Sequence, residues 1–242
     1  MTEDNRFWLD EQSIPFQPGQ TIIQAALAAD VYIPHLCFHD GLTPHGSCRL
    51  CIVDIEGKVR AACAIPARPD MRVKSETPSL REHRRMLIEL LFAEGNHICP
   101  SCEVSGNCQL QALAYDLGMT HYEFAPLNPK REHDGSHPDL YLDMDRCIFC
   151  ELCTRSAVQQ DAKNIFGIGG RGAGAYLFVQ ADSGKLGDTN ITADDHAAHI
   201  CPVGCILPKQ GHYQIPIGSR LYDEQPIHVR GNHRPDESEP TS

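Results

Sequence analysis

The cysteines are the side chains of this sequence with the greatest capacity for chemistry, at 12 among 242 residues. They form three groups whose internal spacings suit metal ligation, and a histidine precedes the second group. Cysteine is the soft ligand that zinc sites and iron–sulfur clusters use. The groups are Cys37, Cys48, Cys51 and Cys63; His97, Cys99, Cys102 and Cys108; and Cys147, Cys150, Cys153 and Cys201, with Cys205 close behind.

The sequence favours a reducing compartment for these thiols. The first residues, MTEDNRFWLDEQ, contain neither the basic nor the apolar region of a secretory signal. No window approaches the apolar run that a membrane span needs. We therefore expect a cytoplasmic protein without membrane contact, in which metal ligation is favoured over disulfide bonds.

The first group predicts a [2Fe–2S] cluster. Two irons bridged by two sulfides take four thiolates, two on each iron. Cys37, on a long loop, is placed to approach from the side opposite the close pair Cys48 and Cys51, and Cys63 completes the set. A four-cysteine zinc site is the alternative, although zinc ribbons use two close C-x2-C pairs and this group has a single one.

The second group predicts a [4Fe–4S] cluster with one histidine ligand. Cys99, Cys102 and Cys108 leave such a cluster one ligand short, because each iron takes an external donor. His97 stands two residues before Cys99, and imidazole is a competent iron ligand. Replacing a thiolate by a neutral imidazole raises the reduction potential. In the alternative, His97 only donates a hydrogen bond to a sulfur, and water or a partner's residue is the fourth ligand.

The third group predicts another [4Fe–4S] cluster. The segment CIFCELC, residues 147–153, matches the start of the C-x2-C-x2-C-x3-C-P pattern of bacterial ferredoxins. Ala157 stands where the fourth cysteine of that pattern would be, so a remote cysteine must supply the last ligand. Cys201 is favoured over Cys205 because Pro202 follows it, as in the ferredoxin pattern.

These assignments use all the cysteines except Cys205 and give about ten irons per chain. We expect Cys205 to be a buried thiol that behaves as a small hydrophobic residue. If Cys205 served the second group instead, His97 would be unnecessary, but the third unit would then have to fold back onto the second.

Short secondary-structure elements must position the three groups. Strand-like segments RFWL and SIPF, a helix in PGQTIIQAALAAD and a strand in LCIVDIEG indicate a small mixed unit around the first group. Two helices, within residues 77–95 and 108–118, flank the second group, and AYLFV after the third group predicts a strand. His83 in the first of these helices is expected at the surface.

We predict an α+β fold of small units held partly by their metal centres, because aliphatic runs are too few for one large core. The expected units are residues 1–77, a [2Fe–2S] ferredoxin-like β-grasp domain; 78–124, a small helical [4Fe–4S] domain with one histidine and three cysteine ligands; 125–222, a ferredoxin-like [4Fe–4S] domain; and 223–242, a disordered tail.

The sequence offers no catalytic constellation. It has no P-loop, and the G-x-G-x-x-G match over residues 167–172 is followed by a strand-like segment instead of the helix that a dinucleotide site needs. A net charge of −11 without a basic stripe argues against nucleic acid as a partner. Three clusters without a catalytic site indicate an electron conduit whose donor and acceptor lie in partner subunits. A zinc-stabilised scaffold or regulatory protein is the alternative from another class.

The segments CFHDGLTPHGSCRLC, NHICPSCEVSGNCQLQ, CIFCELC and ICPVG resemble, in this order, the amino-terminal part of the large iron–sulfur subunit of respiratory NADH dehydrogenase. The resemblance extends over about residues 5–210. That family usually has three residues between the histidine and the first cysteine of the middle motif, where this sequence has only Ile98. The large molybdopterin-type domain of that subunit is missing, so the sequence is similar to the small iron–sulfur subunit in the diaphorase half of cytoplasmic NAD-reducing [NiFe] hydrogenases.

This second resemblance implies a subunit of an oxidoreductase that holds one [2Fe–2S] and two [4Fe–4S] clusters and has no catalytic site of its own. It implies that electrons from H2 cross the chain to FMN and then to NAD+. The implied partners are a flavin- and NAD-binding diaphorase subunit and the small and large hydrogenase subunits, which alone would carry FMN, NAD and the Ni–Fe site. An iron–sulfur subunit of an NAD-dependent formate dehydrogenase or of an NADH dehydrogenase module is the alternative.

Overall fold

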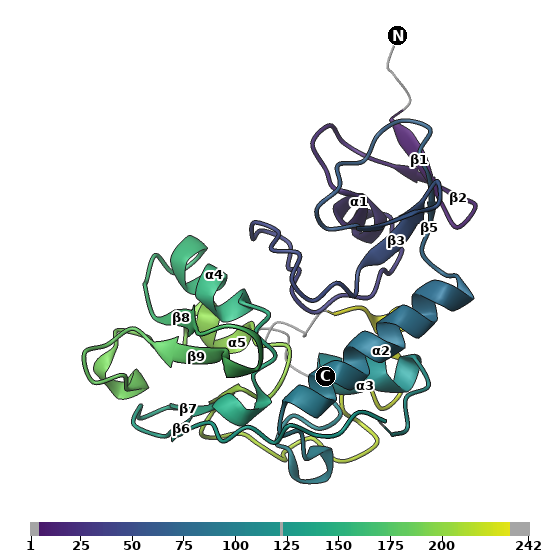
Figure 1. Ribbon diagram of the computed structural model, residues 1–242. Helices are drawn as coiled ribbons and strands as arrows, with labels where there is room; N and C mark the ends of the chain where they lie inside the picture. The colour runs from purple at the N-terminus through teal and green to yellow at the C-terminus, as the bar shows by residue number, and fades with distance from the viewer. Residues whose placement is uncertain (1–4, 122, 233–242) are drawn as a thin grey trace.

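The structure is a computed structural model that describes residues 5–121 and 123–232. Within these residues, six α-helices and three small β-sheets form an α+β fold, as the sequence predicts. Figure 1 shows a sheet-containing unit at the top, a long helix beneath it, and a second set of short strands and helices at the lower left.

The first unit is a five-stranded sheet with one helix against it, which is the predicted β-grasp arrangement. The strand order is β2-β1-β5-β3-β4, with β1 and β5 parallel and the other neighbours antiparallel. Alternation along β1 buries Phe7 and Leu9 in one core with Ile22 and Ile23 of the helix. The elements are β1 (Arg6–Leu9), β2 (Gln12–Pro15), α1 (Ile22–Ala28), β3 (Ile52–Ile55), β4 (Lys58–Ala61) and β5 (Arg72–Lys74).

Helix α2 (Pro78–Glu94) follows the sequence signals for a helix start and stop. The Thr77 hydroxyl accepts a 3.2 Å hydrogen bond from the Leu80 amide, and a proline occupies the first turn. Gly95 caps the other end. Because the helix stops there, the chain passes directly to His97 at its carboxyl end.

Helix α3 (Gln109–Asp116) completes the second unit. It lies beside α2, and a 3-10 helix (Cys99–Ser101) belongs to the connection between them. Six of its eight residues are buried, because it also packs against α6 (Ile227–Arg230) near the end of the described chain. This burial fixes the connection that carries the second cysteine group.

The third unit contains two small sheets and two helices. One sheet has the antiparallel order β10-β7-β6, and β8 and β9 form a separate hairpin. The glycine-rich segment spans the end of β8 and the hairpin turn, where a 3-10 helix (Gly172–Gly174), not an α-helix, precedes β9. The other elements are β6 (His133–Asp134), β7 (Leu140–Asp143), a 3-10 helix (Met144–Arg146), α4 (Leu152–Gln159), β8 (Phe166–Gly169), β9 (Tyr176–Val179), a 3-10 helix (Leu186–Asp188), α5 (His196–His199) and β10 (Ile206–Pro208).

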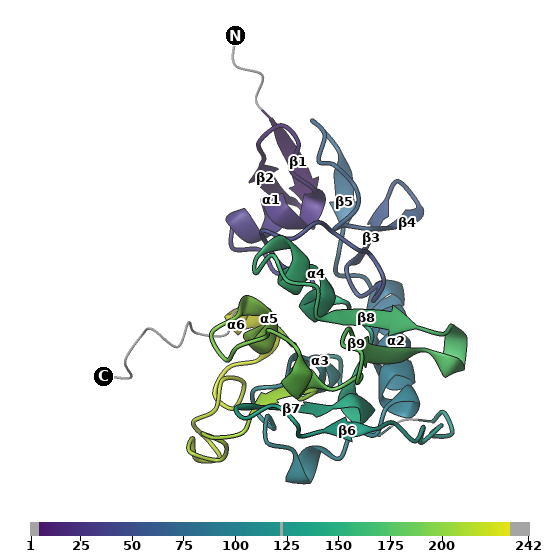
Figure 2. The ribbon, with the colours of Figure 1, turned by 90° about the vertical axis from the view of Figure 1, so that its left-hand side faces the viewer.

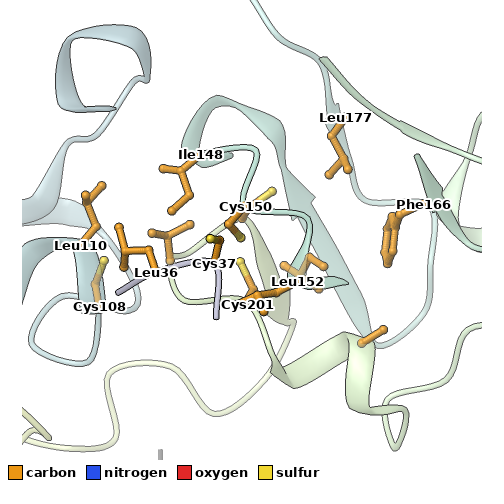
Figure 3. Packing of buried hydrophobic residues seen from close by; sticks show 14 of the residues in the cluster. Leu36, Cys37, Cys108, Leu110, Ile148, Cys150, Leu152, Phe166, Leu177 and Cys201 are labelled. Carbon is orange, nitrogen blue, oxygen red and sulfur yellow. The ribbon is translucent and has the colours of Figure 1, made fainter. Parts of the chain in front are cut away.

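Two apolar cores hold these elements. The smaller one lies within the first unit. The larger one joins α2 and α3 to the third unit and also takes in Leu36 and Leu50 from the loop of the first unit. Figure 2 shows α4 directly beneath the first unit, and Figure 3 shows Leu36 and Cys37 among residues of the second and third units. The units therefore share an interior in which cysteines of all three groups are packed.

The carboxyl-terminal segment differs from the expected disordered tail over its described part. Ile227 in α6 is fully buried. The Asn232 side chain donates hydrogen bonds to the His35 carbonyl (2.8 Å) and to the Gln109 side-chain oxygen (2.7 Å). Residues 233–242 lie outside the described residues.

The domain limits at residues 77, 124 and 222 stay predictions. Among the described residues, no helix combines the length and the apolar character that crossing a membrane requires.

Candidate metal centres

The first cysteine group gathers at one end of the β-grasp sheet. Cys37, Cys51 and Cys63 are buried, and Cys48 is half-buried. The antiparallel pairing of β3 with β4 brings Cys51, just before β3, close to Cys63, just after β4. The long loop after α1 brings in Cys37.

The sulfurs of this group are hydrogen-bonded in two pairs. The Cys48 thiol donates to the Cys37 sulfur and lowers the pKa of Cys37 to about 5, and the Cys48 amide lies 3.5 Å from the same sulfur. The Cys51 thiol donates to the Cys63 sulfur and lowers the pKa of Cys63. Two thiol pairs, each with one member whose pKa is lowered, fit the two irons of a [2Fe–2S] cluster.

The cysteine loops of the first and third groups contain residues with left-handed backbone conformations. In the first loop Gly46 and Arg49 have φ of 74° and 58°. In the third group Phe149 and Glu151 have φ of 52° and 56°. Such residues turn successive amides to one side, which creates a concave surface that attracts negative charge. The Phe149 amide, 3.5 Å from the Cys147 sulfur, is one result.

A fully buried arginine, Arg84, binds the backbone on both sides of Cys51 in the first group. The Arg84 guanidinium donates to the carbonyls of Leu50 (3.0 Å), Ile52 (2.7 Å) and Ser75 (2.9 Å), and it forms an ion pair with Glu76. The first two carbonyls flank Cys51. Sequence reasoning missed this role, because the arginine lies on a helix of the next unit and no local pattern marks it.

The second group converges on one pocket between α2 and α3. His97, Cys99, Cys102 and Cys108 all line it. Cys108 is the N-cap of α3, where free amides and the helix dipole stabilise negative charge. The short spacing between the histidine and the first cysteine does not prevent this convergence, and the intervening Ile98 is 66% exposed.

The His97 side chain has the properties of a metal ligand. Its Nε2 is buried without a hydrogen-bond partner among the described residues, while the ring hydrogen-bonds to the Leu91 backbone. Burial, assisted by Arg131 and Arg146, lowers its pKa to about 4, so the ring is neutral at pH 7. A Cβ on Gly95 would lie 2.3 Å from Nε2, so glycine at this position leaves the ring its space. A buried neutral nitrogen lacking a partner fits the missing fourth ligand.

The third group also shares one pocket, and Cys205 belongs to it. Cys147, Cys150, Cys153, Cys201 and Cys205 all line this pocket. Hydrogen bonding with the side chains of Cys147 and Cys201, together with burial, raises the pKa of the Cys205 thiol well above its usual value. Cys205 is buried in the larger apolar core, as expected, and it also lies among the candidate ligands. It does not line the pocket of the second group.

We expect Cys205→Ala to retain all three clusters, because Cys201 suffices as the fourth ligand of the third one. Cys201→Ala is the matched variant and is expected to lose about four irons. Iron analysis and low-temperature EPR spectra of the reduced proteins measure both results. Loss of a [4Fe–4S] signal in Cys205→Ala, with retention in Cys201→Ala, would reverse the assignment.

The third group adjoins both of the others. Arg155 of α4 donates to the carbonyls of Cys37 (2.6 Å) and Cys150 (3.3 Å), which joins the first group to the third. Val203 lines the pockets of both the second and the third groups. Figure 3 draws Cys37, Cys150 and Cys201 as members of one buried cluster. The three groups therefore form a continuous series through the protein interior.

The donor sets fit iron–sulfur clusters at all three positions. All 12 cysteines are free thiols, and the described residues contain no disulfide bond. Two thiol pairs suit a [2Fe–2S] cluster, and each remaining pocket offers at least four donors for a [4Fe–4S] cluster. The fold and the sites define an iron–sulfur protein that transfers electrons.

Three protein-family models match successive parts of the chain. Residues 5–78 match the 2Fe-2S iron-sulfur cluster binding domain. Residues 84–123 match the NADH-ubiquinone oxidoreductase-G iron-sulfur binding region, and residues 140–207 match the 4Fe-4S single cluster domain. The protein thus carries one [2Fe–2S] and two [4Fe–4S] clusters, and zinc is not the metal that these families bind.

The chain belongs to the family of the gamma subunits of NAD-reducing hydrogenases. It is 37% identical to the NAD-reducing hydrogenase HoxS subunit gamma of Cupriavidus necator, over 92% of this chain and 94% of that protein. It superposes with a TM-score of 0.91 on a chain in the crystal structure of NAD+-reducing [NiFe]-hydrogenase in the H2-reduced state, at 51% identity over 94% of this chain and 97% of the other.

The similarity to NADH dehydrogenase is confirmed as well. The chain is 30% identical to the mitochondrial NADH dehydrogenase [ubiquinone] iron-sulfur protein 1 of Solanum tuberosum over 84% of its own length. It spans only 27% of that relative.

Proposed function

We propose that this protein relays electrons between a hydrogen-oxidising module and a flavin- and NAD-binding diaphorase subunit, so that H2 and NAD+ yield NADH and H+. The carrying observation is the continuous series of thiol groups, in which Arg155 joins the first to the third and Val203 borders both the third and the second. Bound clusters supply one-electron transfer. The chain's own residues hold them, exclude water and set their potentials.

We further propose the ligand of each iron. The four thiols of the first group hold the [2Fe–2S] cluster. His97 joins three thiols at the second position because its Nε2 is buried without a partner in the described chain. Cys201 joins three thiols at the third position. The assigned domain limits are residues 1–77, 78–124 and 125–222, followed by the segment 223–242.

The relatives support the assignment of partners. One is named as the gamma subunit of an NAD-reducing hydrogenase, and one solved structure is an NAD+-reducing [NiFe]-hydrogenase. In this proposal FMN and NAD belong to a diaphorase subunit, and the Ni–Fe site belongs to the hydrogenase subunits. The assembly is cytoplasmic.

The test is the native complex, isolated anaerobically through a tag on this chain. We expect nickel and flavin in the complex, and NAD+ reduction that depends on H2 and not on formate. A complex that lacks nickel and reduces NAD+ with formate would instead assign the chain to a formate dehydrogenase. The isolated chain should be brown and contain about ten irons. A colourless chain that contains zinc would overturn the electron-transfer role itself.

A further inference from the structure

We propose that Arg146 is a positioning residue that raises the reduction potential of the second cluster by binding one of its ligand sulfurs. The inference rests on the proposed ligation of that cluster by Cys102. It assigns a function to a charged side chain that the cysteine pattern does not single out.

The guanidinium is aimed at the sulfur and held there by two carboxylates. Arg146 Nη1 lies 3.4 Å from the Cys102 sulfur. The same nitrogen forms an ion pair with Glu103, and Nε forms another with Asp143 at 2.7 Å. The Arg146 side chain is 17% exposed, so bulk water screens its charge only partly.

The backbone around Arg146 comes from the third unit. Arg146 ends a 3-10 helix and immediately precedes Cys147. Gly204, from the segment between the two candidate fourth ligands, completes the site, because a Cβ there would lie 3.1 Å from Arg146 Nη1 and 3.3 Å from the Cys102 sulfur. The third unit therefore places a positive charge on a ligand of the second cluster, at the boundary between the two cluster sites.

The direction of the effect follows from the charge. One-electron reduction adds a negative charge beside Arg146 without forming or breaking a bond. A cation that also donates a hydrogen bond to a ligand sulfur stabilises the reduced form more than the oxidised form. Glu103 and Asp143 oppose part of this stabilisation. Removing Arg146 should thus lower the potential, and removing the Glu103 charge should raise it.

The test uses redox titration of the purified chain with dithionite, followed by EPR spectroscopy. We expect Arg146→Gln to lower the ratio of reduced to oxidised second cluster at fixed potential about tenfold, which corresponds to about 59 mV for one electron. Glu103→Gln should shift the midpoint upward, and Arg146→Lys should fall between wild type and Arg146→Gln. The [2Fe–2S] signal is the internal reference and should titrate unchanged.

Arg220→Gln is the matched control. Arg220 also reaches the second cysteine segment and is paired with a carboxylate, Asp223, but its Nη1 binds the Ser105 carbonyl (3.0 Å). We expect a smaller shift in this variant than in Arg146→Gln.

Equal midpoints in wild type and Arg146→Gln, with all three signals present, would overturn the role of Arg146 and leave the relay function standing. If Arg146→Gln loses the cluster, the midpoint potential of the second cluster in Glu103→Gln becomes the test. A midpoint above that of wild type supports the proposal, and an equal or lower midpoint overturns it. Wild-type protein without the second signal would instead contradict the proposed function.

Discussion

His97→Ala is expected to lose the second cluster, so that the iron content falls from about ten to about six per chain. The three cysteines of this group supply one iron ligand too few. The Nε2 atom of His97 is buried and has no hydrogen-bond partner in the described chain, so it is free to bind the fourth iron. The other two clusters should remain, because their donors come from separate segments. Iron analysis and EPR spectroscopy of the anaerobically reduced variant measure the effect.

Two further variants make this experiment specific. His83→Ala, on the exposed face of α2, is the control and should keep all the iron. His97→Cys should restore a [4Fe–4S] cluster with a lower potential, because a thiolate adds a negative charge that imidazole lacks. An unchanged iron content and spectrum in His97→Ala would show that His97 is not a ligand.

Arg84→Leu is expected to lower the free energy of unfolding by about 3–5 kcal/mol. The side chain is 0% exposed and binds three backbone carbonyls, which the leucine would leave buried without donors. For a chain of this size the loss corresponds to a fall of roughly 10 °C in the thermal midpoint. Circular dichroism under anaerobic conditions follows the transition.

The neighbouring Arg85 offers a matched control on the same helix. Its side chain is 29% exposed and pairs with the exposed Glu82. Its other partner, the buried Glu89, lies 3.5 Å away and also accepts hydrogen bonds from the amides of Glu123 and Phe124, so Arg85→Leu should cost less than Arg84→Leu. Arg84 binds the carbonyls on both sides of Cys51. On heating, the Arg84→Leu variant should therefore lose the signal of its [2Fe–2S] cluster before those of its two [4Fe–4S] clusters. Equal midpoints for the two variants would contradict the structural role of Arg84.

Much of the fold could be predicted because its signals are local. The helix from Pro78 to Glu94 has its cap, its proline and its terminal glycine within the sequence that forms it. The first hairpin follows from apolar alternation over a few residues. The carboxyl-terminal segment was missed because Ile227 and Asn232 are ordered by contacts with distant parts of the chain, and its own composition is polar.

The type and number of the clusters were determined by the sequence alone. Thiol spacings of two residues are fixed by the covalent chain, and counting donors against irons predicts His97 as a ligand without any coordinates. The residue-by-residue ligand sets stay predictions, and the variants of His97, Cys201 and Cys205 test them.

Only the tertiary structure decided how the three sites are connected. The third cysteine group, last along the chain, adjoins both others through Arg155 and Val203, and Arg146 places the charge of one unit on a sulfur of another. The physical reason is that the contacts of Arg146 with Cys102 and of Arg155 with Cys37 join residues 44 and 118 positions apart and form only when the shared apolar core packs. The kinds of ligand can be predicted from the sequence, whereas the proposed electron path and the proposed effect of Arg146 depend on the packed molecule.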